Sequence, residues 1–250
     1  MRIRDLTHVR IDVVDVPSSG GSLHGLYYHA GGPPATCVVI CHGYSSSKHN
    51  VDPLAFALAA DGFAAFAFDF QGHKLGCSSR PLRAALDLRQ NAIDAVTYAR
   101  TRSARVVLAG HSMGAATAIG AGLELPEVAG VIVMCTGLER NRAFNSSAML
   151  SGLQNRAAYV DGPSAEELTR AMDGFTVQVA ALAPRPTLFI AATKDALVAP
   201  SAVRELYDRA AEPKSFEQVE ATHTDCAERA RFVVARWLRA RGFSDSQSNG

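Results

Sequence analysis

The stretch Gly110-His111-Ser112-Met113-Gly114 decides the fold expected for this chain. An apolar run rich in β-formers, 105–109, precedes it, and small, helix-compatible residues, 115–120, follow it. A strand, a sharp turn and a helix form the context of the G-x-S-x-G nucleophile elbow. So tight a turn strains the backbone of the serine, and its neighbours at −2 and +2 must therefore lack side chains. The stretch predicts a serine hydroxyl clear of the sheet, beside a helix N-terminus that favours a developing anion. Taken alone, the pentapeptide also fits a turn without chemistry, so the rest of the chain has to decide.

Strand and helix patterns alternate on both sides of this stretch. We expect strands at 9–14, 23–29, 36–41, 63–68, 105–109, 128–134, 186–192 and 214–219, and helices at 51–60, 82–101, 112–123, 201–211 and 225–241. The first two strands are expected to form a hairpin-like pair, and Asp225 with Glu228 predicts a capping box for the last helix. The alternation predicts an α/β fold, with a mainly parallel twisted sheet and helices on both faces. Sites in such sheets lie at the carboxyl ends of the strands.

The length of 250 residues fits one α/β domain, which we expect to span residues 1–243. About fifty residues separate the strand ending near Met134 from the strand that starts at Pro186, too many for a simple crossover. We therefore predict a small helical lid inserted at 138–183, the alternative being a longer helix with irregular connections. The serine-containing tail, 244–250, is expected to be disordered.

The composition indicates a globular protein and argues against several classes of partner. Hydrophobic residues make up 48% and charged residues 20% of the chain, and the net charge of +1 offers no basic excess for nucleic acid or an anionic membrane. We expect no signal peptide and no membrane-spanning segment, because no apolar run is suitable. The five cysteines show no zinc-type spacing and are expected to be buried free thiols. A reducing compartment, by default the cytoplasm, is the expected location.

Two further side chains are needed to activate the serine. A hydroxyl is a poor nucleophile until a base takes its proton, and the base needs an acid to fix its tautomer. Asp195 follows the strand at 186–192 and is the first candidate acid, with Glu139 as the second. Of the eight histidines, His223 alone is expected on a strand-end loop downstream of both Ser112 and Asp195. The order Ser, Asp, His distinguishes this arrangement from the two other familiar orders of serine triads.

An oxyanion hole requires two backbone N–H groups aimed at one point. Met113, directly after the serine, is expected to supply one of them. Tyr44 is expected to supply the other, because Gly43 before it allows the backbone to approach closely. His42 is expected to order this loop by hydrogen bonding, and His111, inside the elbow, to point elsewhere.

Together these residues resemble the α/β-hydrolase family over essentially the full length of the chain. The resemblance is carried by His42-Gly43, Asp69-Phe70-Gln71-Gly72-His73, the pentapeptide 110–114, Asp195 and His223. It implies that Ser112 is the nucleophile, Asp195 the acid and His223 the general base, with the backbones of Tyr44 and Met113 forming the hole. The loop at 69–79 departs from the family's D-x-x-G-H-G-x-S pattern, so Asp69 and Gly72 are interpreted as loop architecture. The large cap domain of epoxide and haloalkane members is absent, and position 112 is not the aspartate that their chemistry needs.

The leading hypothesis is a serine hydrolase, similar to a carboxylesterase or thioesterase, that cleaves a small acyl substrate through an acyl-enzyme on Ser112. An acyltransferase, lactonase, peptidase or carbon–carbon bond hydrolase would use the same triad. The alternative from another class is a non-catalytic protein that binds a small ligand. No cofactor and no metal are expected, because no metal-type spacing occurs. Arg140, Arg142 and Arg156 of the predicted lid could meet a substrate carboxylate, although exposed lid charge is the simpler interpretation.

Overall fold

An eight-stranded sheet forms the centre of the computed structural model, which describes residues 8–19, 21–76, 80–138 and 154–244. Its strands are β1 (Arg10–Ser18), β2 (Gly21–His29), β3 (Thr36–Cys41), β4 (Ala64–Phe68), β5 (Arg105–His111), β6 (Gly130–Met134), β7 (Thr187–Ala192) and β8 (Lys214–Val219). The order across the sheet is β1-β2-β4-β3-β5-β6-β7-β8. β1 and β2 form the expected antiparallel hairpin, β2 also runs antiparallel to β4, and all other neighbours are parallel. The predicted α/β fold is confirmed.

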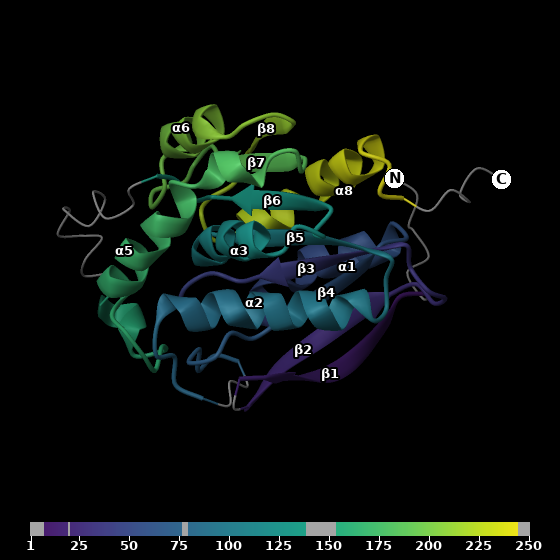
Figure 1. The fold of residues 1–250 in the computed structure, drawn as a ribbon, viewed down its shortest axis with the longest axis horizontal. Coiled ribbons are helices and arrows are strands. Elements are labelled where there is room, and N and C mark those ends of the chain that lie inside the picture. The colour runs from purple at the N-terminus through teal and green to yellow at the C-terminus, as the bar shows by residue number, and fades with distance from the viewer. Residues whose placement is uncertain (1–7, 20, 77–79, 139–153, 245–250) are drawn as a thin grey trace.

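Helices cover both faces of this sheet (Figure 1). One face packs against α2 (Ala85–Arg100), α3 (Met113–Glu124), α5 (Ala165–Thr176), η3 (Val179–Leu182) and α6 (Pro200–Arg209). The other face packs against α1 (Asp52–Ala60), α7 (Cys226–Arg229) and α8 (Arg231–Ala240), with η1 (Lys48–Val51) leading into α1. Every residue of β3, β4, β6 and β7 is buried, which explains why these segments are continuous apolar runs.

The last helical segment differs from its prediction. A single helix was expected at 225–241, but α7 ends at Arg229 and α8 begins at Arg231. At this junction the carbonyl of Glu228 accepts a hydrogen bond of 2.8 Å from the Arg231 side chain. The predicted capping box is also wrong, because the Asp225 carboxylate accepts instead from the backbone and hydroxyl of Thr222, at 2.7 and 2.5 Å.

The order of the strands creates a switch point at the centre of the sheet, where a binding site is expected. From β3 the chain passes to β4 on one side and then to β5 on the other. The loops that leave the carboxyl ends of β3 and β5 therefore diverge, and open α/β sheets bind ligands at such a switch point. The G-x-S-x-G stretch occupies the end of β5.

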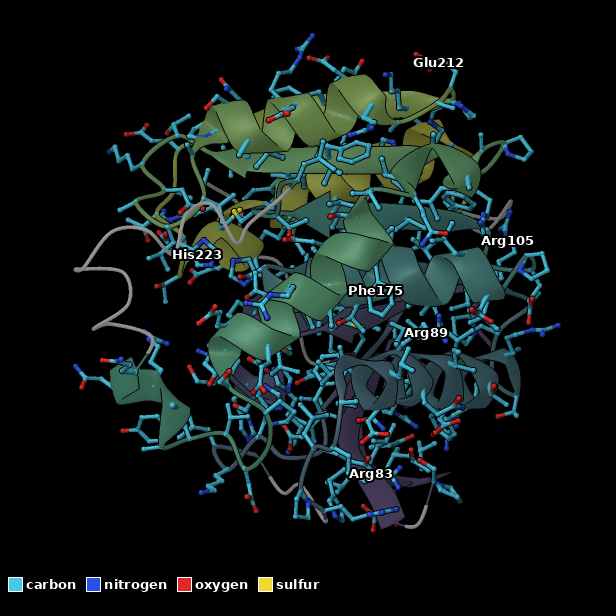
Figure 2. All side chains as sticks on the ribbon, turned by 60° about the vertical axis from the view of Figure 1, so that its left-hand side comes forward. Arg83, Arg89, Arg105, Phe175, Glu212 and His223 are labelled. Carbon is cyan, nitrogen blue, oxygen red and sulfur yellow. The ribbon has the colours of Figure 1, made fainter. Side chains whose placement is uncertain are left out.

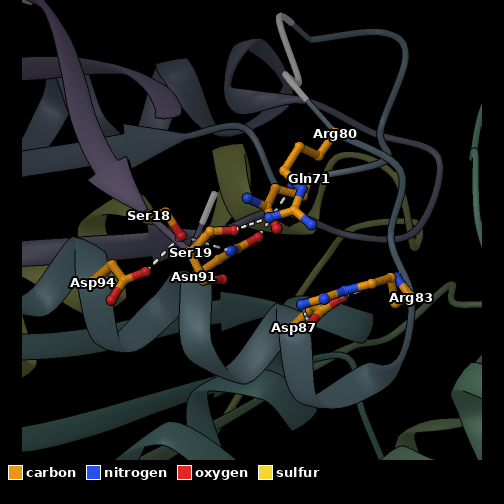
Figure 3. A network of polar contacts seen from close by, with 8 residues as sticks. All are labelled: Ser18, Ser19, Gln71, Arg80, Arg83, Asp87, Asn91 and Asp94. Carbon is orange, nitrogen blue, oxygen red and sulfur yellow. Dashed lines mark hydrogen bonds and ion pairs between the residues drawn. The ribbon is translucent and has the colours of Figure 1, made fainter. Parts of the chain in front are cut away.

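A chain of polar contacts fixes the loop after β4 to the hairpin and to α2 (Figure 3). The buried Asn91 side chain accepts from the backbone amide of Gln71 and donates to the Ser18 hydroxyl, both at 3.1 Å. Ser18 in turn donates to Asp94 at 2.5 Å. These contacts satisfy polar groups that would otherwise be buried without partners. They hold one end of a loop that also contributes Leu75 to the wall of the candidate site.

Helix α5 is anchored to the core by Phe175. The Phe175 ring packs on Gly120 of α3, where a Cβ would lie only 2.7 Å from the ring. The Arg89 guanidinium of α2 lies over the same ring, 5.6 Å from its centroid (Figure 2). Leu168 and Met172 of α5 are buried in the same core. The part of the predicted lid segment that contains α5 is therefore packed against the domain, while 139–153 lie outside the described residues.

Candidate active site

The serine at the end of β5 has the geometry that its neighbours predict. Ser112 has φ of 55° and ψ of −115°, a strained conformation for a residue with a side chain, and α3 begins directly after it. A Cβ on Gly110 would overlap the carbonyl group of Gly114, and a Cβ on Gly114 would overlap that of Cys41. Only glycine fits these two positions, which confirms the sharp strand-to-helix turn.

Asp195 and His223 meet because they follow neighbouring parallel strands, β7 and β8. The His223 Nδ1 lies 2.7 Å from Asp195 Oδ2, and the carboxylate has no exposed surface. The other oxygen, Oδ1, accepts from the amides of Leu197 and Val198, each at 2.8 Å. Burial acts to raise the pKa of the Asp195 carboxyl, but the hydrogen bond and charge of His223 and these two amides outweigh it, so that the pKa lies below its ordinary value. An ionised Asp195 keeps the proton of His223 on Nδ1 and leaves Nε2 free to accept one.

Ser112 and His223 line one cavity of about 660 Å³, together with Asp195. Ser112 is 7% exposed, and no hydrogen bond joins its hydroxyl to another residue in the described part of the chain. Hydrogen bonds between a nucleophile and its base are often long before substrate binds. The three sequence-predicted side chains thus line one cavity.

His111 does not point away from the site, so this prediction is wrong. Its ring lines the cavity, with its centroid 4.8 Å from that of His223. Its Nε2 lies 2.7 Å from the backbone oxygen of His223, and since a carbonyl can only accept, this nitrogen carries the proton. The bond ties the elbow to the loop of His223.

The two amides expected to form an oxyanion hole come from neighbouring loops. Tyr44 and Met113 both line the cavity, and in the described regions neither amide donates to another group. A Cβ on Gly43 would lie 3.4 Å from His111 Nδ1 and 3.6 Å from the Ser112 Cβ, so the loop after β3 runs close to the elbow. Gly43, which directly precedes Tyr44, therefore lies close to Ser112, and the oxyanion hole stays a prediction.

His42 orders the loop after β3, as the sequence predicts. Its Nδ1 donates to the carbonyl of Gly43 at 2.8 Å, and its Nε2 accepts from the amide of Phe70 at 3.1 Å. Complete burial, followed by the neighbouring His73, lowers the pKa of His42 to about 3. A neutral ring is required for this pattern, because a charged ring would have no acceptor nitrogen.

A buried ion pair joins the same loop to the one after β4, and sequence reasoning missed it. The Asp69 carboxylate accepts from the backbone amide of Lys48 at 2.8 Å and forms an ion pair with the Lys48 ammonium group. A Cβ on Gly76 would overlap the Asp69 carboxylate, and Gly72 has φ of 78°. The interpretation of Asp69 and Gly72 as loop architecture is confirmed. Lys48 belongs to no motif. It follows β3, however, and Asp69 follows the neighbouring β4, so the order of the strands could have predicted that the two side chains lie close together.

The remaining walls of the cavity are mainly apolar. They include Val51, Leu75, Leu138, Leu168, Met172, Leu197 and Val198. Two charged side chains away from the candidate triad also line it, Arg156 and Glu205. Arg156 donates to the Ser45 hydroxyl at 3.3 Å, and Ser45 follows Tyr44 with φ of 50°. The residues Glu139, Arg140 and Arg142 lie outside the described part of the chain.

Four cysteines are buried free thiols, as expected: Cys37, Cys41, Cys135 and Cys226. One of them belongs to a group of three side chains able to hold a metal ion. His111, Cys135 and His223 each offer a ligand atom, and these atoms all lie within 4.8 Å of one another. Among the helices that the structure describes, none is both long and apolar enough to span a bilayer.

Comparisons with known proteins agree with this architecture. Residues 32–164 match the family model described as serine aminopeptidase, S33. The Pyrococcus furiosus esterase Pf2001 shares 19% identity and a TM-score of 0.71, over 95% of this chain and 92% of that one. An acetyl xylan esterase from Paenibacillus sp. R4 shares 20% identity and a TM-score of 0.71, over 98% and 87% of the two chains. The uncharacterized protein Rv2307c of Mycobacterium tuberculosis is 28% identical over 224 residues, which are 86% of this chain and 72% of that protein. Since the family match covers more than half of the chain, this protein belongs to the serine aminopeptidase S33 family of α/β hydrolases.

Proposed function

We propose that this hydrolase cleaves esters or thioesters of small acyl substrates through an acyl-enzyme on Ser112. The observation that carries the proposal is the 2.7 Å hydrogen bond between His223 Nδ1 and Asp195 Oδ2, in a cavity that Ser112 also lines. The free thiols fit the predicted cytoplasmic location.

In this proposal His223 acts first as a base and then as an acid. Its Nε2 takes the proton of the Ser112 hydroxyl while Oγ attacks the carbonyl carbon of the substrate. The amides of Tyr44 and Met113, with the N-terminus of α3, stabilise the negative charge on the carbonyl oxygen. His223 then gives the proton to the departing alcohol or thiol. A water molecule, activated by the same nitrogen, releases the acid and restores the serine.

The shape and lining of the cavity support an acyl group without charge. Half of the residues that line it are Leu, Val, Met or Ala, and such a surface favours aliphatic chains over ionised ones. A cavity of about 660 Å³ is within the ordinary range for small-molecule sites.

Covalent labelling with a fluorophosphonate and a panel of p-nitrophenyl esters and acyl-CoA thioesters of graded length test the proposal. We expect the wild type to be labelled and active, and Ser112→Ala to be neither. Ser46→Ala, which changes another serine of the cavity wall, is the matched control and should stay labelled. A wild type that resists labelling would support the non-catalytic binding protein instead.

A second candidate function, an aminopeptidase, is favoured by Glu205. This carboxylate lines the cavity and is separate from the Asp195–His223 pair, so it could bind the α-ammonium group of a peptide. The family description points the same way. Aminoacyl p-nitroanilides distinguish the two: turnover of these amides that Glu205→Gln lowers while ester turnover persists would favour the peptidase.

A further inference from the structure

Three potential metal ligands lie close together beside the cavity. His111 ends β5, Cys135 directly follows the neighbouring β6, and His223 lies after β8. One atom from each lies within 4.8 Å of the other two. The positions are far apart in the sequence, which is why no metal-type spacing is visible there. The two histidines line the cavity, while Cys135 is buried behind them.

In each ring, one nitrogen is hydrogen-bonded to a protein oxygen, and the other can act as a metal ligand. His223 uses Nδ1 on Asp195, and His111 uses Nε2 on the backbone oxygen of His223. The remaining nitrogens, His223 Nε2 and His111 Nδ1, keep their lone pairs. A metal-binding histidine usually donates its other N–H to a carboxylate or a carbonyl, and both arrangements are present here.

The third ligand, Cys135, is completely buried beside the two rings. The neighbouring Cys226, followed by burial, raises the pKa of the Cys135 thiol, so this thiol is protonated until an ion binds. Cys135 has φ of 52°, so its backbone adopts a left-handed conformation that is unusual for a residue with a side chain.

We propose that His111, Cys135 and His223 bind a thiophilic divalent cation, with Zn²⁺ as the best match, and that this cation inhibits the enzyme. Two imidazoles and one thiolate suit zinc, with water completing a tetrahedral set. The cation enters through the cavity, and the Cys135 thiol releases its proton to solvent on binding. The bound ion occupies His223 Nε2, so this ring can no longer take a proton from Ser112. The inhibition rests on the proposed function, whereas the binding does not.

Cobalt binding tests the site without any assay of activity. Titration of the full-length protein with Co²⁺ should give one equivalent bound and a thiolate-to-cobalt charge-transfer absorption. In Cys135→Ser that absorption should vanish and the affinity should fall at least tenfold. Cys41→Ser, at a buried thiol outside this group, and Cys77→Ser, outside the described residues, should retain both. Thermal unfolding verifies that each variant is folded. Cobalt absorption that persists in Cys135→Ser, or its absence in the wild type, would overturn the site.

Zinc inhibition tests the consequence. Zn²⁺ should slow p-nitrophenyl ester hydrolysis and fluorophosphonate labelling of the wild type, and a chelator should restore both. The inhibition constant should rise at least tenfold in Cys135→Ser and stay unchanged in Cys41→Ser. Cobalt binding by a protein without esterase activity would leave the metal site standing and contradict the proposed function. Esterase activity without cobalt absorption would contradict the metal site and leave the proposed function standing.

Discussion

At the scale of single residues, Asp195 uses its two oxygens differently. Oδ1 accepts two backbone amides, and Oδ2 accepts from His223 Nδ1. In Asp195→Asn the side-chain oxygen should keep the backbone amides, which turns the NH₂ group toward His223. The ring must then carry its proton on Nε2 and cannot deprotonate Ser112, so we expect kcat to fall by about 10⁴. Ester kinetics test this, with thermal unfolding as the control for folding. A rate near that of the wild type would remove Asp195 as the acid.

The Lys48–Asp69 pair is a second feature at this scale. The two side chains are 7% and 0% exposed. Removing one charge leaves the other buried without its partner, and we expect Asp69→Asn to lower the free energy of unfolding by about 3–5 kcal/mol. The double variant Lys48→Met/Asp69→Asn, which carries neither charge, should recover part of that loss. Urea unfolding measures both. An equal loss in the single and double variants would contradict the pairing argument.

The residues also show what could be predicted from the sequence. The conformation of Ser112 was predictable, because two glycines at fixed positions permit only one kind of turn. The cavity-facing position of His111 was not, since its partner is the carbonyl of a residue far along the chain. The pairing of Lys48 with Asp69 and the grouping of Cys135 with two histidines were missed for the same reason, because both depend on which strands become neighbours.

At the scale of elements, the packing of α5 on α3 depends on Gly120. An added Cβ there would lie 2.7 Å from the Phe175 ring, whereas one at Gly174, also in a helix, would meet no atom within 4 Å. We expect Gly120→Ala to destabilise the fold by about 1–3 kcal/mol, because the ring must move. Gly174→Ala should stabilise it by about 0.5–1 kcal/mol through helix propensity. Urea unfolding of both variants gives the comparison, and changes of the same sign would contradict it.

Helix ends show where local patterns succeed and fail. The Asp225–Glu228 pattern did not produce a capping box, because the Asp225 carboxylate accepts its hydrogen bonds from Thr222 instead. Ser164 and Glu167 form a complete capping box at α5, in a segment for which the sequence predicted only a small helical lid. The same local signal therefore has two outcomes, and a competing side chain three residues away decides between them.

At the scale of the whole molecule, two buried histidines link stability to pH. Burial is the main cause that lowers the pKa of His42 to about 3 and that of His73 to about 4, against an ordinary value of 6.5. Below pH 6.5 the unfolded chain therefore binds more protons than the folded one, and stability falls with pH until the folded-state pKa values are reached. Between pH 7.5 and 5 we expect a loss of about 2 kcal/mol for each histidine.

Urea unfolding at these two pH values measures the loss. His73→Asn keeps a donor for the carbonyl of Gln71. It should remove the part of the pH-dependent loss of unfolding free energy that is due to His73. His49→Asn, at an exposed position, should leave the pH dependence of stability unchanged. An unaltered dependence in His73→Asn would show that His73 does not contribute.

The aromatic anchor of α5 has a consequence for selectivity. Helix α5 forms part of the cavity wall and is packed through Phe175 against α3 and α2, so it cannot move outward to admit a longer substrate. This wall should limit the length of the substrate. Turnover should stay constant as the acyl chain grows and then fall sharply once the end of that chain reaches α5. Trimming this wall, for example with Met172→Ala, should shift the drop toward longer chains.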